Sequence, residues 1–221
     1  MTQRRETGFT LIEMMVIVAI VGITAAFAVP SWQRVQANNR AKAAAREIAN
    51  AFQLARNQAI MAEQSTVVFW SAVGGVDACG NVLPAPITVL ADANGNCCID
   101  AGEDGVSLPK DPAREFAGLN WGVTFAPAQV PGDPGGGDFT LGSSFTDQFG
   151  NQTHWVAFRP DGVPVGFTAA CNMGSVGSGA GGVYLTNGGA ARASRDYAVV
   201  LSPLGSTRIH AFNRNTLTWN Q

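Results

Sequence analysis

The chain has 221 residues, of which 14% are charged, and a formal net charge of −2. So weak a net charge provides no chain-wide field of the kind that nucleic-acid-binding proteins use, and composition alone indicates no acidic partner. The glycines and prolines cluster in the later two thirds of the chain, which favours strands joined by turns and loops there.

Residues 9–32 form a long apolar stretch that is predicted to be a transmembrane helix segment. Its only charged residue is Glu13, and a helix of this length spans a hydrocarbon core of ~30 Å. Arg4 and Arg5 precede the stretch and are expected to stay in the cytoplasm. We therefore predict a single-pass inner-membrane protein with its N-terminus in the cytoplasm and its head in the periplasm.

A secretory signal peptide is the alternative interpretation of the same stretch. It would need a basic start, an apolar centre and a small-residue cleavage site, and residues 26–28 (Ala-Phe-Ala) supply such a site. The mature chain would then begin at Val29. The residues C-terminal to the stretch distinguish the two interpretations.

Residues 33–63 are predicted to continue the same helix as an amphipathic half. Helix formers dominate, and no glycine or proline lies between Ser31 and Glu63. Apolar residues recur every three or four positions along one face, at Ala41, Ala45, Ile48, Phe52, Ala55 and Ala59. The two halves would form one rod of ~80 Å, a continuation that a signal peptide does not need. Pro30 predicts a bend or a locally melted turn within the rod.

The run from Gly8 to Glu13 (Gly-Phe-Thr-Leu-Ile-Glu) resembles the type IV prepilin signature, in which glycine and phenylalanine are followed by a glutamate. The resemblance implies that a prepilin peptidase removes a leader of residues 1–8 by cleaving after Gly8. It also implies N-methylation of the new amino terminus at Phe9. The partners that it implies are other pilins or pseudopilins in a helical filament or a tip complex.

Glu13 needs a partner if it lies within the bilayer, because a carboxylate there costs ~2.5–3.5 kcal/mol on insertion scales. Cleavage would create an α-amino group at Phe9 that is mostly protonated at neutral pH. In a packed helix bundle, Glu13 of one subunit would neutralise this amine on its neighbour and so fix the axial register. The alternative is a carboxylate that reaches the interface near the helix start.

Residues 64–221 are predicted to form a periplasmic β-rich head, because the hydrophobic period changes after Gln64. Eight short segments are predicted as strands: 65–70, 87–90, 120–125, 154–158, 183–186, 197–201, 207–212 and 216–219. The glycine-rich stretch 174–182 lacks the lysine of a phosphate loop, so we expect a flexible loop there. A long helix followed by strands predicts an α+β fold, with the helix packed on antiparallel sheet.

Two segments of the chain resemble the GspH/FimT branch of pseudopilins and minor pilins. They are residues 41–70 and residues 199–205 with the strand that follows. The resemblance implies a minor subunit of a type IV pilus or of a type II secretion pseudopilus. FimT-like subunits are associated with DNA capture, which here would use Arg208 and Arg214, with further phosphate contacts from Arg192 and Arg195. Residues 205–208 hold only one arginine where a paired G-R-x-R is expected, so DNA binding is the alternative.

Residues 92–103 match the ligand spacing of an EF-hand-like calcium loop. Positions 1, 3, 5, 7, 9 and 12 would be filled by Asp92, Asn94, Asn96, the carbonyl of Cys98, Asp100 and Glu103. The departure is Cys97 at position 6, where the sharp turn normally needs glycine. Three of the ligands are charged, so we expect a dissociation constant of ~10⁻⁴–10⁻³ M. The alternative is a solvated loop rich in Asn and Asp, which favour turns.

All four cysteines lie in the head, and their even number suits an oxidising compartment. Cys79 lies shortly before the adjacent pair Cys97 and Cys98, so a bridge from Cys79 to one of them would staple this insertion. The remaining cysteine of the pair would reach Cys171. A zinc site is the alternative, but the chain has no C-x-x-C spacing and its two histidines are far away in sequence.

Enzyme signatures are missing from the sequence. It contains neither the motifs of serine hydrolases and zinc proteases nor a phosphate-binding or dinucleotide-binding motif in a strand–helix context. We therefore expect a protein without catalytic activity.

Overall fold

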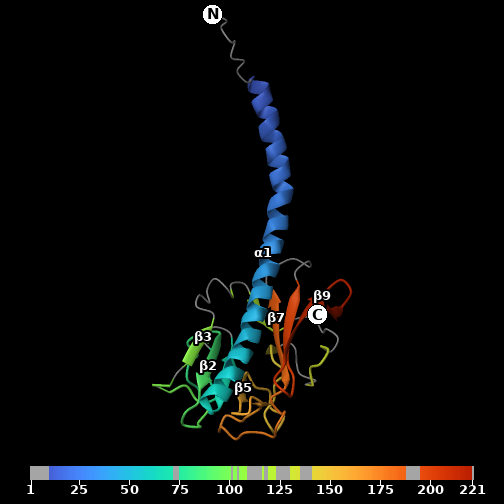
Figure 1. The fold of residues 1–221 in the computed structure, drawn as a ribbon. Coiled ribbons are helices and arrows are strands. Elements are labelled where there is room, and N and C mark those ends of the chain that lie inside the picture. The colour runs from blue at the N-terminus through green and yellow to red at the C-terminus, as the bar shows by residue number, and fades with distance from the viewer. Residues whose placement is uncertain are drawn as a thin grey trace, which may run out of the picture.

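The computed structural model describes residues 10–71, 75–100, 102–103, 105–108, 116, 119–122, 130–134, 141–187 and 195–220. Within these residues a long helix comes first, and ten strands follow it. Figure 1 shows the helix projecting from the head at its N-terminal end and packing against the strands at its C-terminal end. The predicted α+β fold is confirmed.

The helix α1 (Leu11–Ala62) begins after the N-cap Thr10 and ends at Glu63, whose φ of 52° leaves the helical region. Pro30 lies inside this helix. Of the bend or locally melted turn predicted there, the melted turn is absent, because the helix stays continuous through Pro30. Figure 1 shows the helix with a gentle curve. Proline removes a single backbone hydrogen bond, and the good helix formers on either side keep the remaining ladder intact.

The strands form two five-stranded sheets. The first has the order β3-β2-β1-β5-β6 and contains β1 (Thr66–Trp70), β2 (Ile87–Ala91), β3 (Gly105–Leu108), β5 (Trp155–Phe158) and β6 (Pro164–Val165). The second has the order β10-β9-β8-β7-β4 and contains β4 (Leu119–Trp121), β7 (Gly181–Asn187), β8 (Asp196–Leu201), β9 (Thr207–Asn213) and β10 (Thr218–Asn220). The strand pairs described in both sheets are antiparallel.

The stretch 174–182 was predicted as a flexible loop, and it contains a turn that leads into a strand. Residues 181–182 already belong to β7. A Cβ atom on Gly181 would lie 2.7 Å from the Phe145 ring, and one on Gly179 would overlap the backbone of Val165. The glycines therefore permit close approach of neighbouring segments, which the sequence does not distinguish from a loop.

The core of the head lies where α1 crosses both sheets. All six residues of the predicted apolar face are buried, together with Ala44 and Ala51. Phe52 is at the centre, with its ring centroid 5.8 Å from that of Trp70 and 6.4 Å from that of Phe158. Val199 and other inner-face residues of the second sheet join the same cluster. Small alanines elsewhere on the helix let the two sheets approach it closely.

One turn geometry recurs at five hairpins, at residues 77–81, 147–151, 159–163, 168–172 and 202–206. In each turn the first N–H donates to the fifth carbonyl, and the fourth N–H donates to the first carbonyl. The fourth residue has a positive φ in all five turns. It is glycine in four of them and Cys171 in the other. This is the three-residue hairpin loop in which a type I turn is followed by a left-handed residue.

Candidate functional site

The N-terminal half of α1 is fully exposed. Residues 10–36 make no buried contact with the head, and Leu11 and Phe27 are each 78% exposed. The mean hydropathy of the most apolar 18-residue window is 2.4, so by length and composition this helix is able to cross a membrane. An apolar surface of this extent indicates contact with lipid or with other proteins.

Glu13 caps the helix to which it belongs. The Glu13 N–H donates to Thr10 Oγ1 at 3.3 Å, and the Thr10 N–H donates to Glu13 Oε2 at 3.4 Å, which together make a capping box. The bond to the Glu13 carboxylate is long for a hydrogen bond and uses Oε2. Gly8 and Phe9 lie outside the described residues, and the pairing of Glu13 with a neighbouring amine stays a prediction.

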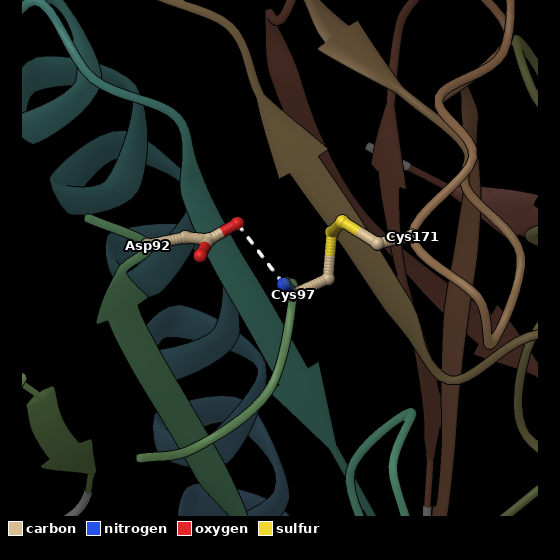
Figure 2. A group of neighbouring side chains, drawn as sticks. All are labelled: Asp92, Cys97 and Cys171. Atoms are coloured by element: carbon tan, nitrogen blue, oxygen red, sulfur yellow. Dashed lines mark hydrogen bonds between the residues drawn. A yellow bond between two sulfur atoms is a disulfide. The ribbon is translucent and has the colours of Figure 1, made fainter. Parts of the chain in front are cut away.

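Asp92 closes a tight turn directly after β2. Its Oδ1 accepts N–H bonds from Gly95 at 2.9 Å and Asn96 at 3.1 Å, and its Oδ2 accepts the N–H of Cys97 at 3.1 Å. Figure 2 shows the last of these bonds beside the disulfide between Cys97 and Cys171. Cys97 has a φ of 59°, the left-handed conformation that the calcium-loop pattern assigns to glycine at this position.

The other predicted calcium ligands lie in the same loop. Asn94 and Asn96 direct their Nδ2 atoms to Asp100 Oδ2 at 2.8 Å and 2.6 Å. Glu103 Oε1 accepts the N–H of Ala93 at 3.3 Å. The structure thus brings together the side chains that the spacing selected, and calcium binding stays a prediction.

Both cysteine bridges are present. Cys79 is bonded to Cys98 with Cα atoms 5.7 Å apart, and Cys97 is bonded to Cys171 with Cα atoms 5.4 Å apart. The adjacent pair therefore joins the 92–103 loop to two different hairpins. Asp92 lies close to the sulfurs of Cys97 and Cys171, but these sulfurs bond to one another and are not available as metal ligands.

Asp77 was missed by the sequence analysis, although it holds the stapled region together. It is 2% exposed and accepts N–H bonds from Cys79, Asn81 and Ile99. Burial raises its pKa, but the hydrogen bonds from Ile99, Asn81 and Cys79 outweigh that effect and leave the pKa lowered. The missed signal is a repeated D-x-x-G-N, which occurs at 77–81, 92–96 and 147–151.

Arg208 and Arg214, proposed for DNA contact, differ in exposure and in pairing. Arg214 forms a buried ion pair with Asp196, with Nε donating to Oδ2 at 2.9 Å and a guanidinium nitrogen donating to Oδ1 at 2.6 Å. Arg208 is exposed on β9. The structure therefore does not bring the pair together as one cationic site. Arg192 lies outside the described residues.

Comparisons with known proteins locate the similarity in the N-terminal segment. Residues 3–29 match the family model described as the prokaryotic N-terminal methylation motif. Two curated relatives, both called "Fimbrial protein" and both from Pseudomonas aeruginosa, are 41% identical over 58 residues. That alignment covers 26% of this chain and 37% of each relative.

The chain therefore spans just over a third of the length of these curated relatives. No solved structure matches the chain. The methylation motif overlaps the start of a long helix whose apolar N-terminal part is not buried against the head. The prepilin signature predicted such a helix. On these findings the chain is type IV pilin-like.

Proposed function

We propose that the chain is a minor subunit, without catalytic activity, of a type IV pilus or a type II secretion pseudopilus. One observation carries this proposal: a single continuous helix buries its C-terminal half in the head and leaves its N-terminal half fully exposed. A soluble domain has no use for an apolar protrusion of this kind. A filament subunit needs it twice, first as a membrane anchor and later as the packing surface against neighbouring helices.

The proposed location follows from the same arrangement. Residues 9–32 would span the inner membrane, with the leader in the cytoplasm and the head in the periplasm. The disulfides Cys79–Cys98 and Cys97–Cys171 support this side for the head, because such bonds form in oxidising compartments. A prepilin peptidase would act at the Gly8–Phe9 junction on the cytoplasmic side.

Within the pilin-like proteins we place the chain in the GspH/FimT branch, on the residues that resemble it. DNA capture, the alternative role for FimT-like subunits, has less support. Arg214 is bound to the buried Asp196, and Arg208 is the exposed member of the proposed pair. The structural role in a filament therefore remains our proposal.

Mass spectrometry of the mature protein tests the processing that this proposal needs. The expected first residue is an N-methylated Phe9, because the run from Gly8 to Glu13 resembles the prepilin signature, which implies cleavage after Gly8. A mature chain that begins at Val29 would identify the apolar stretch as a secretory signal peptide and would remove the filament role.

A further inference from the structure

A group of five exposed cations surrounds the point where α1 enters the head. Four lie on α1 and one directly before β8: Arg34, Arg40, Lys42, Arg46 and Arg195. We call this group the basic collar. Between Glu13 and the end of α1 the helix contains one carboxylate, Glu47. In the part of the chain that the structure describes, the ion pairs are Arg159–Asp161 and Arg214–Asp196, so the collar forms none.

The helix and the second sheet meet within the collar, at Arg46 and Arg195. The Arg195 N–H donates to Asn38 Oδ1 at 2.9 Å, which holds the start of β8 against the helix at the level of the collar. Burial raises the pKa of Tyr197, and the guanidinium groups of Arg195 and Arg46 offset part of that rise. Arg46 of the helix and Arg195 beside the second sheet therefore lie on the same side of the junction.

The position of the collar relates it to the bilayer. It follows directly after the apolar stretch, whose last residue, Trp32, is 65% exposed, and tryptophan favours the membrane–water interface. Along the helix, Arg34, Arg40 and Lys42 lie about 3, 12 and 15 Å beyond Trp32. The headgroup layer is about 5–7 Å thick, and the field of an anionic surface persists for a further ~8 Å at physiological salt. The first three collar residues thus lie within reach of headgroup phosphates.

The remainder of the head has the opposite charge. Without Arg195, residues 64–221 contain six Lys or Arg and twelve Asp or Glu. The collar is therefore a local feature at the membrane end of the molecule and not part of a generally basic surface. Since its cations have no carboxylate partners within the described residues, they are available to an external anion.

We propose that the basic collar binds the headgroup phosphates of anionic phospholipids and holds the unassembled subunit against the bilayer surface. The proposal rests on the proposed function in that residues 9–32 must span the membrane. The field of anionic lipids attracts Lys and Arg beside a membrane span and decays within a Debye length. A subunit that leaves the bilayer for a filament would have to release these lipids first.

The test is the lipid that the unassembled full chain retains. The chain is reconstituted in vesicles of equal parts phosphatidylglycerol and phosphatidylcholine and extracted in a mild detergent, and the retained lipids are counted by mass spectrometry. Wild type is expected to retain phosphatidylglycerol several-fold in excess of phosphatidylcholine. The triple variant Arg34→Gln/Arg40→Gln/Lys42→Gln, which removes the three collar residues within reach of the headgroups, is expected to bring the retention of the two lipids close to parity. High salt should lower it in the wild type.

The matched control is Arg159→Gln/Arg208→Gln, which removes two exposed arginines outside the collar and is expected to retain wild-type lipid. Equal retention by the triple variant and wild type would overturn the proposal. If the triple variant keeps its lipid but loses binding to duplex DNA or incorporation into filaments, the collar serves nucleic acid or a neighbouring subunit instead. The lipid is counted on unassembled chains. A failure to form filaments would therefore contradict the proposed function without changing the result of the lipid test.

Discussion

At the scale of single residues, Cys97 and Cys171 have the same conformation, with φ values of 59° and 58°. Residues with a side chain adopt this left-handed region at a cost of about 1 kcal/mol or more. Cys97 stands where the calcium-loop pattern has glycine. The structure shows that the backbone keeps the conformation that glycine would have there, and that the bond to Cys171 joins two such positions.

This conformation predicts an unusual ranking of cysteine replacements. Cys97→Ala/Cys171→Ala should destabilise the chain by about 3–5 kcal/mol, because it removes the bridge and leaves two alanines with positive φ. Cys97→Gly/Cys171→Gly should recover about 1–2 kcal/mol of that loss, because glycine adopts the conformation freely. Urea denaturation of the full chain in detergent measures both values.

The second bridge is the control for this ranking. Cys79 and Cys98 are not among the positive-φ residues, so glycine there should be no better than alanine and should lower stability by about 0.5–1 kcal/mol per site. The same order of alanine and glycine at both bridges would show that backbone conformation does not set the cost.

His210 provides a second prediction at this scale. It is 1% exposed, and neither ring nitrogen has a hydrogen-bond partner within the described residues. Burial lowers its pKa, and the charge of Arg208 lowers it further. As the pH falls below the ordinary value of 6.5, the unfolded chain takes up a proton at this site before the folded chain does. Stability should therefore decrease as the medium becomes mildly acidic.

The replacement His210→Leu isolates this contribution. It should flatten the loss of stability just below pH 6.5, and it should be close to neutral above that pH, because the replaced ring nitrogens make no bonds. Asp77 also has a lowered pKa, but its stabilisation is lost only in the acid range near and below 3.8. Denaturation midpoints measured from neutral to mildly acidic pH separate the two groups, and an unchanged pH slope in the variant would contradict the prediction.

At the scale of elements, regular patterns could be predicted from sequence and tertiary pairings could not. The apolar face of α1 could be predicted from the spacing of its apolar residues. A helix has 3.6 residues per turn, so a face that packs on a sheet has apolar residues every three or four positions. The short β3 and β6 were missed, since they contain four and two residues and take their conformation from neighbours in the sheet. The predicted cysteine staple is present. Asp77 was missed although it opens one of the D-x-x-G-N repeats, and its bond from Ile99 in another loop is a tertiary contact that the sequence does not show.

The 92–103 loop is the element for which calcium remains a prediction. Calcium that binds the folded state alone should stabilise it by about 3 kcal/mol at a hundredfold excess over its dissociation constant. The melting temperature of the full chain should therefore rise with millimolar calcium. Magnesium at equal concentration should have little effect, because it demands stricter geometry and gives up its waters reluctantly.

The variant for this test should spare Asp92, which also holds three backbone N–H groups of the turn. Asp100→Asn/Glu103→Gln removes two charges from the exposed part of the loop and should abolish the calcium response. Asp161→Asn, outside the loop, is the control. A wild-type melting curve indifferent to calcium would reduce the segment to a disulfide-stapled turn.

At the scale of the whole molecule, charge and covalent structure give different indications of orientation. The positive-inside rule alone does not place the head outside the membrane. The basic collar, on the head side of the apolar stretch, has five cations, whereas the leader side has Arg4 and Arg5. The two disulfides are the stronger argument, since they require an oxidising compartment. A collar that binds lipid phosphates reconciles the two, because its cations would then have partners at the outer surface.

Assembly of the whole molecule gives the last prediction, and the capping box sharpens it. Glutamine at this helix position also completes a capping box, so Glu13→Gln removes the charge but keeps the cap. Glu13→Ala removes both, while Thr10→Ala weakens the cap by about 1 kcal/mol and keeps the charge. If Glu13 pairs with the amine of a neighbouring Phe9, both Glu13 variants should be cleaved and inserted normally and should lose incorporation into filaments. Thr10→Ala should still be incorporated.

Immunoblots of sheared filaments, with whole-cell protein as reference, measure this incorporation. Normal incorporation of Glu13→Gln beside failure of Glu13→Ala would assign Glu13 to the cap of its own helix and remove the argument for charge pairing between subunits.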